Sequence, residues 1–160
     1  MLGFLDRTVE GVLGVAKWLA LPVVTLLFLQ WPLRDIVHGY SREANDLGQW
    51  LFALYVAASI TAATRARTHL AADTVARRYS PGVRERLAQA GALFGLIPWS
   101  LVVLATSWKI VLDSTRMLER FPDSFNPGYF IIKLALWLLA LLMLTDSIIA
   151  VLRPRGTLRR

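Results

Sequence analysis

Four long apolar stretches, separated by short charged segments, constrain the fold of this 160-residue chain more than any other feature. They run over residues 11–33, 47–64, 88–112 and 128–152. Residues 47–64 and 88–108 contain no charged side chain, so neither segment has a charged face that a helix could turn toward water. Apolar stretches of about 18 or more residues are typical of transmembrane helices. The sequence therefore predicts an all-α integral membrane protein with four transmembrane helices in a single membrane domain over residues 1–160.

The distribution of positive charge predicts the orientation of these helices. Residues 65–87 hold six arginines and the tail after residue 152 holds four, whereas residues 34–46 and 113–127 each hold two basic and three acidic residues. Because cytoplasmic loops of membrane proteins carry an excess of Lys and Arg, both termini and the middle segment are expected in the cytoplasm. The arginines of the cytoplasmic basic segment are expected to contact lipid headgroups; they are Arg65, Arg67, Arg77, Arg78, Arg84 and Arg86.

The same segment predicts a short amphipathic helix at the membrane surface, between the second and third spans. Apolar side chains recur there every fourth residue, with arginines between them, at Val75, Tyr79, Val83 and Leu87. This pattern is typical of a helix that lies with its apolar side on the membrane and its basic side toward anionic headgroups. Ser80 and Pro81 interrupt it, and they are suited to cap and to begin a new helix that continues into the third span.

Two ionisable side chains are expected to lie deep inside the predicted spans, Lys17 in the first and Asp146 in the fourth. Each is six residues from the cytoplasmic end of its span, so both are about 9 Å deep. A charge at that depth is costly unless it is paired, and we expect Lys17 and Asp146 to form an intramembrane ion pair. The alternative is that each reaches the surface alone or meets a residue of another subunit. Lys109 and Lys133 lie near the outer boundary and are expected to extend to it.

The residues available for metal or cofactor chemistry are few. The chain has no cysteine, and its two histidines, His38 and His69, lie in loops on opposite sides of the predicted membrane, so they do not form the axial pair of a membrane haem. His69 and Asp73 share a helix face, but two ligands of this kind do not hold zinc. The sequence predicts no metal site and no cofactor. With no soluble module to carry a basic surface, it also predicts no nucleic-acid binding.

Several residues together resemble a known family. Arg34 follows the first span, Asp46 lies in Asn-Asp-Leu-Gly-Gln before the second, and Arg-Ala-Arg-Thr-His-Leu-Ala-Ala-Asp follows it and contains His69 and Asp73. An acidic residue before the second span and a basic stretch that runs into His-x-x-x-Asp after it are common in the small membrane subunit of tripartite ATP-independent periplasmic (TRAP) transporters, the DctQ-like family. The chain is similar to that family in these motifs and in its four spans with both ends inside.

The resemblance implies a non-enzymatic subunit of a sodium-driven importer of organic acids in a bacterial or archaeal inner membrane. In such transporters a solute-binding protein captures the substrate outside the cytoplasm, a large membrane subunit moves it, and the small subunit is a scaffold beside the large one. The outer loops are then expected to contact the solute-binding protein through their charged residues, which are Arg42, Glu43, Asp46, Asp113, Arg116, Glu119, Arg120 and Asp123.

One other function remains open from the residues alone. A stand-alone four-helix carrier coupled to protons would use Asp146 or Glu10 as its titrating carboxylate. Against it, Asp146 lies away from the middle of its span and Glu10 lies at the membrane edge. The carrier hypothesis predicts that the purified chain moves substrate by itself.

Overall fold

The computed structural model describes residues 2–36, 39, 41–66 and 79–152. Its helices are α1 (Leu2–Ala16), α2 (Ala20–Asp35), α3 (Arg42–Ala66), α5 (Pro81–Gly91), α6 (Ile97–Arg116) and α7 (Tyr129–Leu152), with a 3-10 turn (Lys17–Leu19) between α1 and α2 and a π-helical turn (Ala92–Leu96) between α5 and α6. Four continuous helical stretches are long and apolar enough to cross a membrane; they are Gly3–Leu33, Arg42–Ala66, Pro81–Arg116 and Tyr129–Leu152. The predicted all-α fold with four such helices is confirmed.

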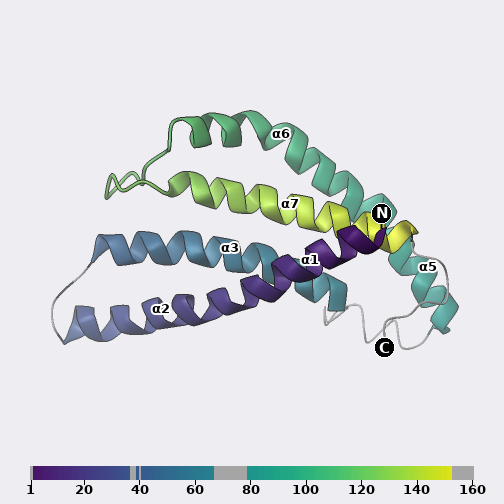
Figure 1. Ribbon diagram of the computed structural model, residues 1–160, viewed down its shortest axis with the longest axis horizontal. Coiled ribbons are helices and arrows are strands. Elements are labelled where there is room, and N and C mark those ends of the chain that lie inside the picture. The colour runs from purple at the N-terminus through teal and green to yellow at the C-terminus, as the bar shows by residue number, and fades with distance from the viewer. Residues whose placement is uncertain (1, 37–38, 40, 67–78, 153–160) are drawn as a thin grey trace.

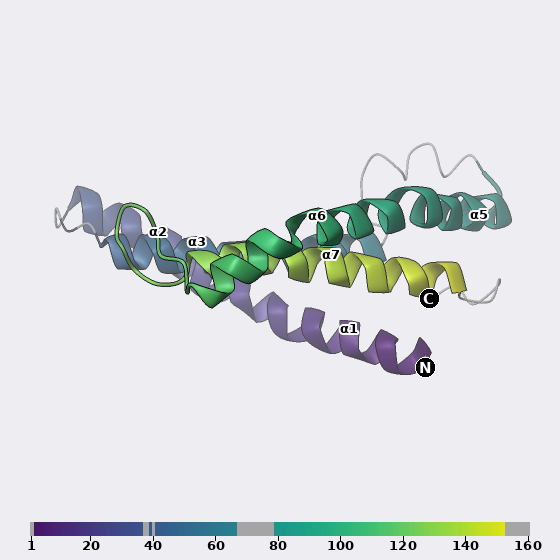
Figure 2. The ribbon, with the colours of Figure 1, turned by 90° about the horizontal axis from the view of Figure 1, so that it is seen from above.

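The long helices lie side by side in a row, in the order α6, α7, α3 and α2 (Figure 1). Helices α3 and α7 form the centre of the row and pack against each other, while α2 packs on α3 and α6 packs on α7. Helix α1 leaves this row at the 3-10 turn, as the view from above shows (Figure 2), and it packs on both α3 and α7. The first residues of α1 and the last residues of α7 therefore lie at the same end of the molecule (Figure 1).

Small side chains line the buried faces of the two central helices. Ala57, Ala58 and Thr61 of α3 and Ala135 and Ala140 of α7 are all buried. Small residues let transmembrane helices approach closely, and close packing is the main attraction between helices where lipid is as apolar as the side chains. Ala57, Ala58 and Thr61 are therefore used for packing inside this chain.

A proline follows each of the two irregular turns. The ring of a proline clashes with the carbonyl four residues earlier, which is that of Trp18 for Pro22 and that of Phe94 for Pro98. Trp18 lies in the 3-10 turn and Phe94 in the π-helical turn. Local 3-10 and π turns are the ordinary ways in which a spanning helix absorbs such a clash. These two turns give the first and third long helices their bends.

The third long helix begins seven residues before the apolar stretch that predicted it. Ser80 has an extended backbone, with φ −61° and ψ 153°, and its carbonyl accepts hydrogen bonds of 3.0 Å from the amides of Val83 and Arg84. Pro81 opens α5, which continues through the π turn into α6, so the predicted helix start at Pro81 is confirmed. Ser80 occupies the N-cap position, but its side chain forms no capping hydrogen bond. The first half of the predicted surface helix, before Tyr79, lies outside the described residues.

Candidate functional site

A buried arginine joins three helices at the end of the molecule where α1 begins. Arg65 of α3 forms ion pairs with Asp6 and Glu10 of α1 and with Asp146 of α7, and we call these four residues the Arg65 cluster. Arg65 Nη1 is 3.4 Å from Asp146 Oδ1, and Arg65 Nη2 is 4.0 Å from Glu10 Oε1. The side chain of Arg65 is only 11% exposed, and those of Asp6 and Asp146 are 19% and 14% exposed.

The guanidinium suits this position because it presents five donors in a rigid plane and stays charged when it leaves water. Arg65 lies near the C-terminal end of α3, and helical side chains point back toward the N-terminus of their helix. The guanidinium is therefore directed from the helix end toward the interior of the membrane, where Asp146 lies six residues before the end of α7. The cluster fixes α1 against both central helices.

The structure brings Asp146 to Arg65, whereas the sequence predicted a pair between Asp146 and Lys17. Lys17 is exposed, and its ammonium lies 6.0 Å from the ring centroid of Trp18. Among the described residues no ion pair joins Lys17 to Asp146. Both residues were matched by depth alone, but the 3-10 turn at Lys17–Leu19 redirects the chain there and Lys17 lies on an outward face. Arg65, which we assigned to lipid headgroups, is instead enclosed by carboxylates.

A second polar network fixes the loop between α6 and α7 to the start of α3. Asp46 is 8% exposed and accepts hydrogen bonds from the hydroxyl of Ser124 and, at 3.1 Å, from Nδ2 of Asn126. Arg42 Nη1 donates to the carbonyl oxygen of Asp123 at 3.2 Å. The network thus pairs groups that are 78 to 81 residues apart in the chain and determines where the loop lies. No pattern in the sequence predicts that Ser124 and Asn126 donate hydrogen bonds to Asp46.

Glu119 anchors the other side of the loop. It accepts hydrogen bonds from the ammonium of Lys133 on α7 and from the hydroxyl of Ser114 on α6. The bond from Lys133, and after it the bond from Ser114, holds the pKa of the Glu119 carboxyl below its ordinary value, against the opposing effect of burial. Lys133 also lies 5.4 Å from the ring centroid of Tyr129. Lys133 therefore has a partner, whereas we expected it to extend to the surface alone.

The loop itself is compact and strained. The ring of Phe121 is buried and meets that of Tyr129 edge to face, with 5.5 Å between their centroids. Leu118 and Phe125 have φ values of 46° and 58°, a backbone region that residues other than Gly and Asn seldom adopt. The same two side chains are 58% and 72% exposed. The hydrogen bonds and the buried ring fix a backbone that a free loop would not keep.

The residues predicted to contact the solute-binding protein differ in the exposure of their side chains. Glu43, Arg116, Arg120 and Asp123 have exposed side chains, and so does Arg42 despite its bond to the loop. Asp113 and Glu119 are half-buried, and Asp46 is withdrawn from the surface altogether.

Some predicted residues cannot be placed in this way. His69, Asp73, Arg67, Arg77 and Arg78 lie outside the described residues, as does the side chain of Arg34. Arg84 and Arg86 lie on α5, where Arg84 is half-buried and Arg86 is exposed. In the described part of the chain, no three His, Cys, Asp or Glu side chains are grouped as a metal ion would require.

Four apolar helices with charges gathered at their ends define a multi-pass membrane-embedded protein. Residues 23–156 match the family model of the tripartite ATP-independent periplasmic transporters, DctQ component. The match covers well over half of the chain, and the chain belongs to this family: it is a small membrane component of a TRAP transporter. The resemblance noted from the sequence motifs is thereby confirmed. No curated protein and no solved structure matches the chain significantly.

Proposed function

We propose that the chain is a non-catalytic scaffold in a TRAP transporter that imports organic acids with a sodium gradient, and that it supports the large membrane subunit. The observation that carries this proposal is the row of helices, in which α2 packs on α3 and α6 packs on α7 (Figure 1). A carrier needs an enclosed site near the middle of the membrane, usually built from broken helices that meet there. Among the described helices of the row, α2 packs on α3 and α6 packs on α7, and both leave long exposed apolar faces that a partner can cover.

The Arg65 cluster supports a structural role over that of a stand-alone carrier. In the carrier hypothesis Asp146 or Glu10 would bind and release the coupling proton. Both carboxylates instead form ion pairs with the guanidinium of Arg65, Asp146 at 3.4 Å and Glu10 at 4.0 Å. The cluster also lies near one end of the helices rather than at their middle. It is suited to join helices and poorly suited to alternate between two sides of a membrane.

The orientation and the outer surface complete the proposal. We place both termini in the cytoplasm of a bacterial or archaeal cell, with Arg84 and Arg86 near the headgroups of the inner membrane. The α6–α7 loop and the start of α3 then face the solute-binding protein. Their exposed charges, chiefly Glu43, Arg116 and Arg120, are suited to guide its approach, since rim charges act more on encounter rate than on affinity.

The test is affinity isolation of the tagged chain, co-expressed with the large membrane subunit and the solute-binding protein, in a mild detergent. We expect a stable complex with the large subunit and a salt-sensitive contact with the solute-binding protein. Recovery of the chain alone, under conditions in which the large subunit is present and folded, would contradict the scaffold role. Labelling of single cysteines from one side of the membrane tests the orientation, and the chain has no native cysteine to interfere.

A further inference from the structure

Lys17 is a cation inside a membrane helix with no partner in the described part of this chain. Its side chain is exposed, and within the described residues its ammonium lies 6.0 Å from the ring centroid of Trp18. That distance is at the limit of a cation–π interaction, which contributes little at such a separation. The acidic residues of α1, Asp6 and Glu10, form ion pairs with Arg65 and not with Lys17.

Lys17 lies well inside the hydrocarbon. The first long helix, Gly3–Leu33, has 31 residues, which corresponds to about 46 Å, against about 30 Å of hydrocarbon. With Trp31 at the lipid–water boundary, Lys17 is 14 residues, or about 21 Å, from that boundary and about 9 Å from the opposite one. An unpaired ammonium at such depth is costly, and such groups usually pair with an opposite charge or line a site.

The helix face that contains Lys17 has no partner among the described residues either. Leu21, Val24, Phe28 and Trp31 follow Lys17 at helical spacing, and their exposed fractions are 60%, 63%, 70% and 63%. We call these five residues the Lys17 face. Within α2 only Val23 is buried, on the side that meets α3. Lipid would satisfy the four apolar side chains but not the ammonium.

We propose that the Lys17 face binds a transmembrane helix of the large membrane subunit, and that an acidic side chain of that helix pairs with Lys17. The inference rests on the proposed function and adds to it the face of contact and the chemistry of the partner residue. Charge complementarity selects this occupant, because an apolar helix with one carboxylate matches an apolar face with one cation. A pair formed away from water is also worth more than one at the surface.

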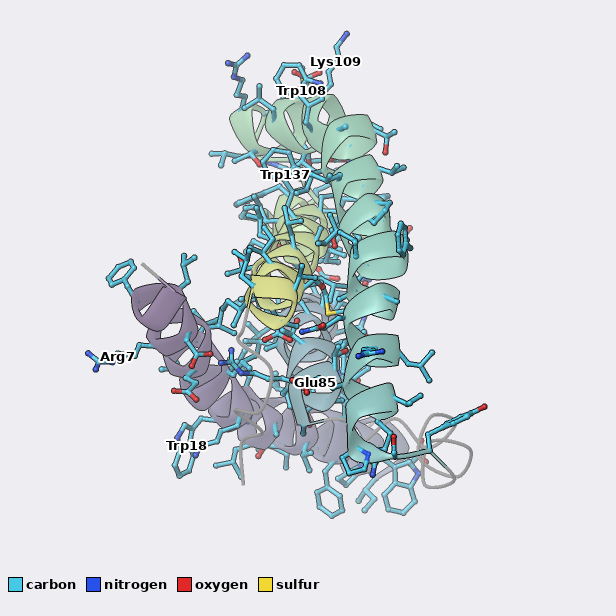
Figure 3. The ribbon with its side chains drawn as sticks, turned by 90° about the vertical axis from the view of Figure 1, so that its right-hand side faces the viewer. Arg7, Trp18, Glu85, Trp108, Lys109 and Trp137 are labelled. Carbon is cyan, nitrogen blue, oxygen red and sulfur yellow. The ribbon has the colours of Figure 1, made fainter. Side chains whose placement is uncertain are left out.

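Lys109 provides a matched comparison on the opposite edge of the row. It is also exposed, and Figure 3 shows Lys109 and Trp108 directed away from the other helices. Asp113 and Glu10 lie just outside the third and first apolar stretches and so mark their ends. Lys109 is four residues, or about 6 Å, from Asp113, whereas Lys17 is seven residues, or about 10 Å, from Glu10. Lys109 can therefore reach the headgroups with its side chain. Substitutions of Lys109 therefore report the effect of changing an exposed lysine that has its own route to the headgroups.

The experiment uses the complex of this chain with the large subunit, purified into bilayer discs of phosphatidylcholine. A single cysteine carrying a photoreactive benzophenone replaces Leu21 on the Lys17 face or Leu101 on α6, which is 51% exposed. We expect L21C to cross-link to the large subunit. In the L21C background, Lys17→Met and Lys17→Glu should reduce both cross-linking and retention of the large subunit, by about tenfold or more for Lys17→Glu. Lys17→Arg should retain both, and Lys109→Met and Lys109→Glu should leave both unchanged.

The outcomes separate the inference from the proposed function. If Lys17→Met and Lys17→Glu retain the large subunit and the cross-link as fully as the L21C parent does, Lys17 only extends to headgroups and the inference is overturned. Cross-linking from L101C but not from L21C would also overturn it while leaving the scaffold role intact. If the native chain binds no large subunit at all, the proposed function fails, and the inference fails with it. Circular dichroism of each variant verifies that the helices are preserved.

Discussion

Replacing Arg65 with Met should release α1 from the two central helices. The substitution keeps an unbranched apolar side chain like the stem of arginine but removes the cation that faces Asp6, Glu10 and Asp146. Removing one partner of a buried ion pair costs about 3–5 kcal/mol, because the remaining charges are left uncompensated. Glu10 is 48% exposed and water can reach that side of the cluster, so we expect a value near the low end, about 3 kcal/mol.

The separation between α1 and α7 reports this loss directly. Spin labels on Phe4→Cys and Leu152→Cys, two exposed positions at the same end of the molecule, give a distance distribution by electron paramagnetic resonance. We expect one narrow distribution in the native background and a broad, longer one with Arg65→Met. A loss of about 3 kcal/mol shifts the docking equilibrium of α1 more than a hundredfold. Arg65→Lys, which keeps the charge, should show an intermediate change.

The control is Arg86→Met, which removes an exposed arginine on α5 and should leave the distribution unaltered. Unfolding in mixed micelles provides a second readout, and only Arg65→Met should lower the free energy of unfolding. If the Arg65→Met distribution and unfolding coincide with those of the native chain, the cluster does not fix α1, and the structural role assigned to Arg65 is refuted.

Three further predictions concern the loop and the bend in the third helix. Asp46→Ala should cost about 1–3 kcal/mol by leaving the donors of Ser124 and Asn126 unpaired, and faster hydrogen exchange of the loop amides would show it, with Glu43→Ala as the exposed control. The pKa of Glu119 is lower in the folded protein than in the unfolded chain, where it is about 4.3. The contribution of the Glu119 carboxylate to stability is therefore complete above about pH 4.3 and is lost as the pH falls through the pKa of the folded protein. Pepsin should therefore cleave the native loop increasingly below about pH 4, while Glu119→Gln is cleaved readily throughout, and equal cleavage of both at every pH would contradict this. Pro98→Ala should convert the π turn to a regular helical turn, seen as a changed label-to-label distance between α5 and α6.

The four spans were predictable because they depend on composition and length, and both are local. The helices nevertheless extend past the apolar stretches: the second reaches from Arg42 to Ala66, where the sequence predicted residues 47–64. A helix satisfies its own backbone hydrogen bonds and can continue into charged residues, so an apolar boundary marks the membrane and not the helix end.

The Arg65 cluster could not be read from the sequence because depth alone does not choose between partners. Lys17 and Asp146 match in depth, but the arrangement of the helices decides which cation Asp146 meets. A usable signal was present, since the second and fourth spans run in the same direction and both end in the same compartment. Arg65 and Asp146 are therefore near neighbours along the membrane normal, and the length of an arginine side chain covers the difference in depth.

The hydrogen bonds between the α6–α7 loop and Asp46 could not be predicted from the sequence, for a different reason. It depends on the backbone at Leu118 and Phe125, two residue types that seldom take positive φ. The sequence gives no turn signal for these positions, and without the turn there is no reason to place Ser124 and Asn126 beside Asp46. The acidic residue before the second span was recognised as a family motif, and the structure adds that its carboxylate holds the loop.

The most direct test of the central claim is solute uptake by sealed vesicles with a sodium gradient. We expect organic-acid uptake only when this chain, the large membrane subunit and the solute-binding protein are all present, and no uptake by this chain alone under a sodium or a proton gradient. Uptake by the purified chain alone would show that it is a carrier in its own right and would contradict the account.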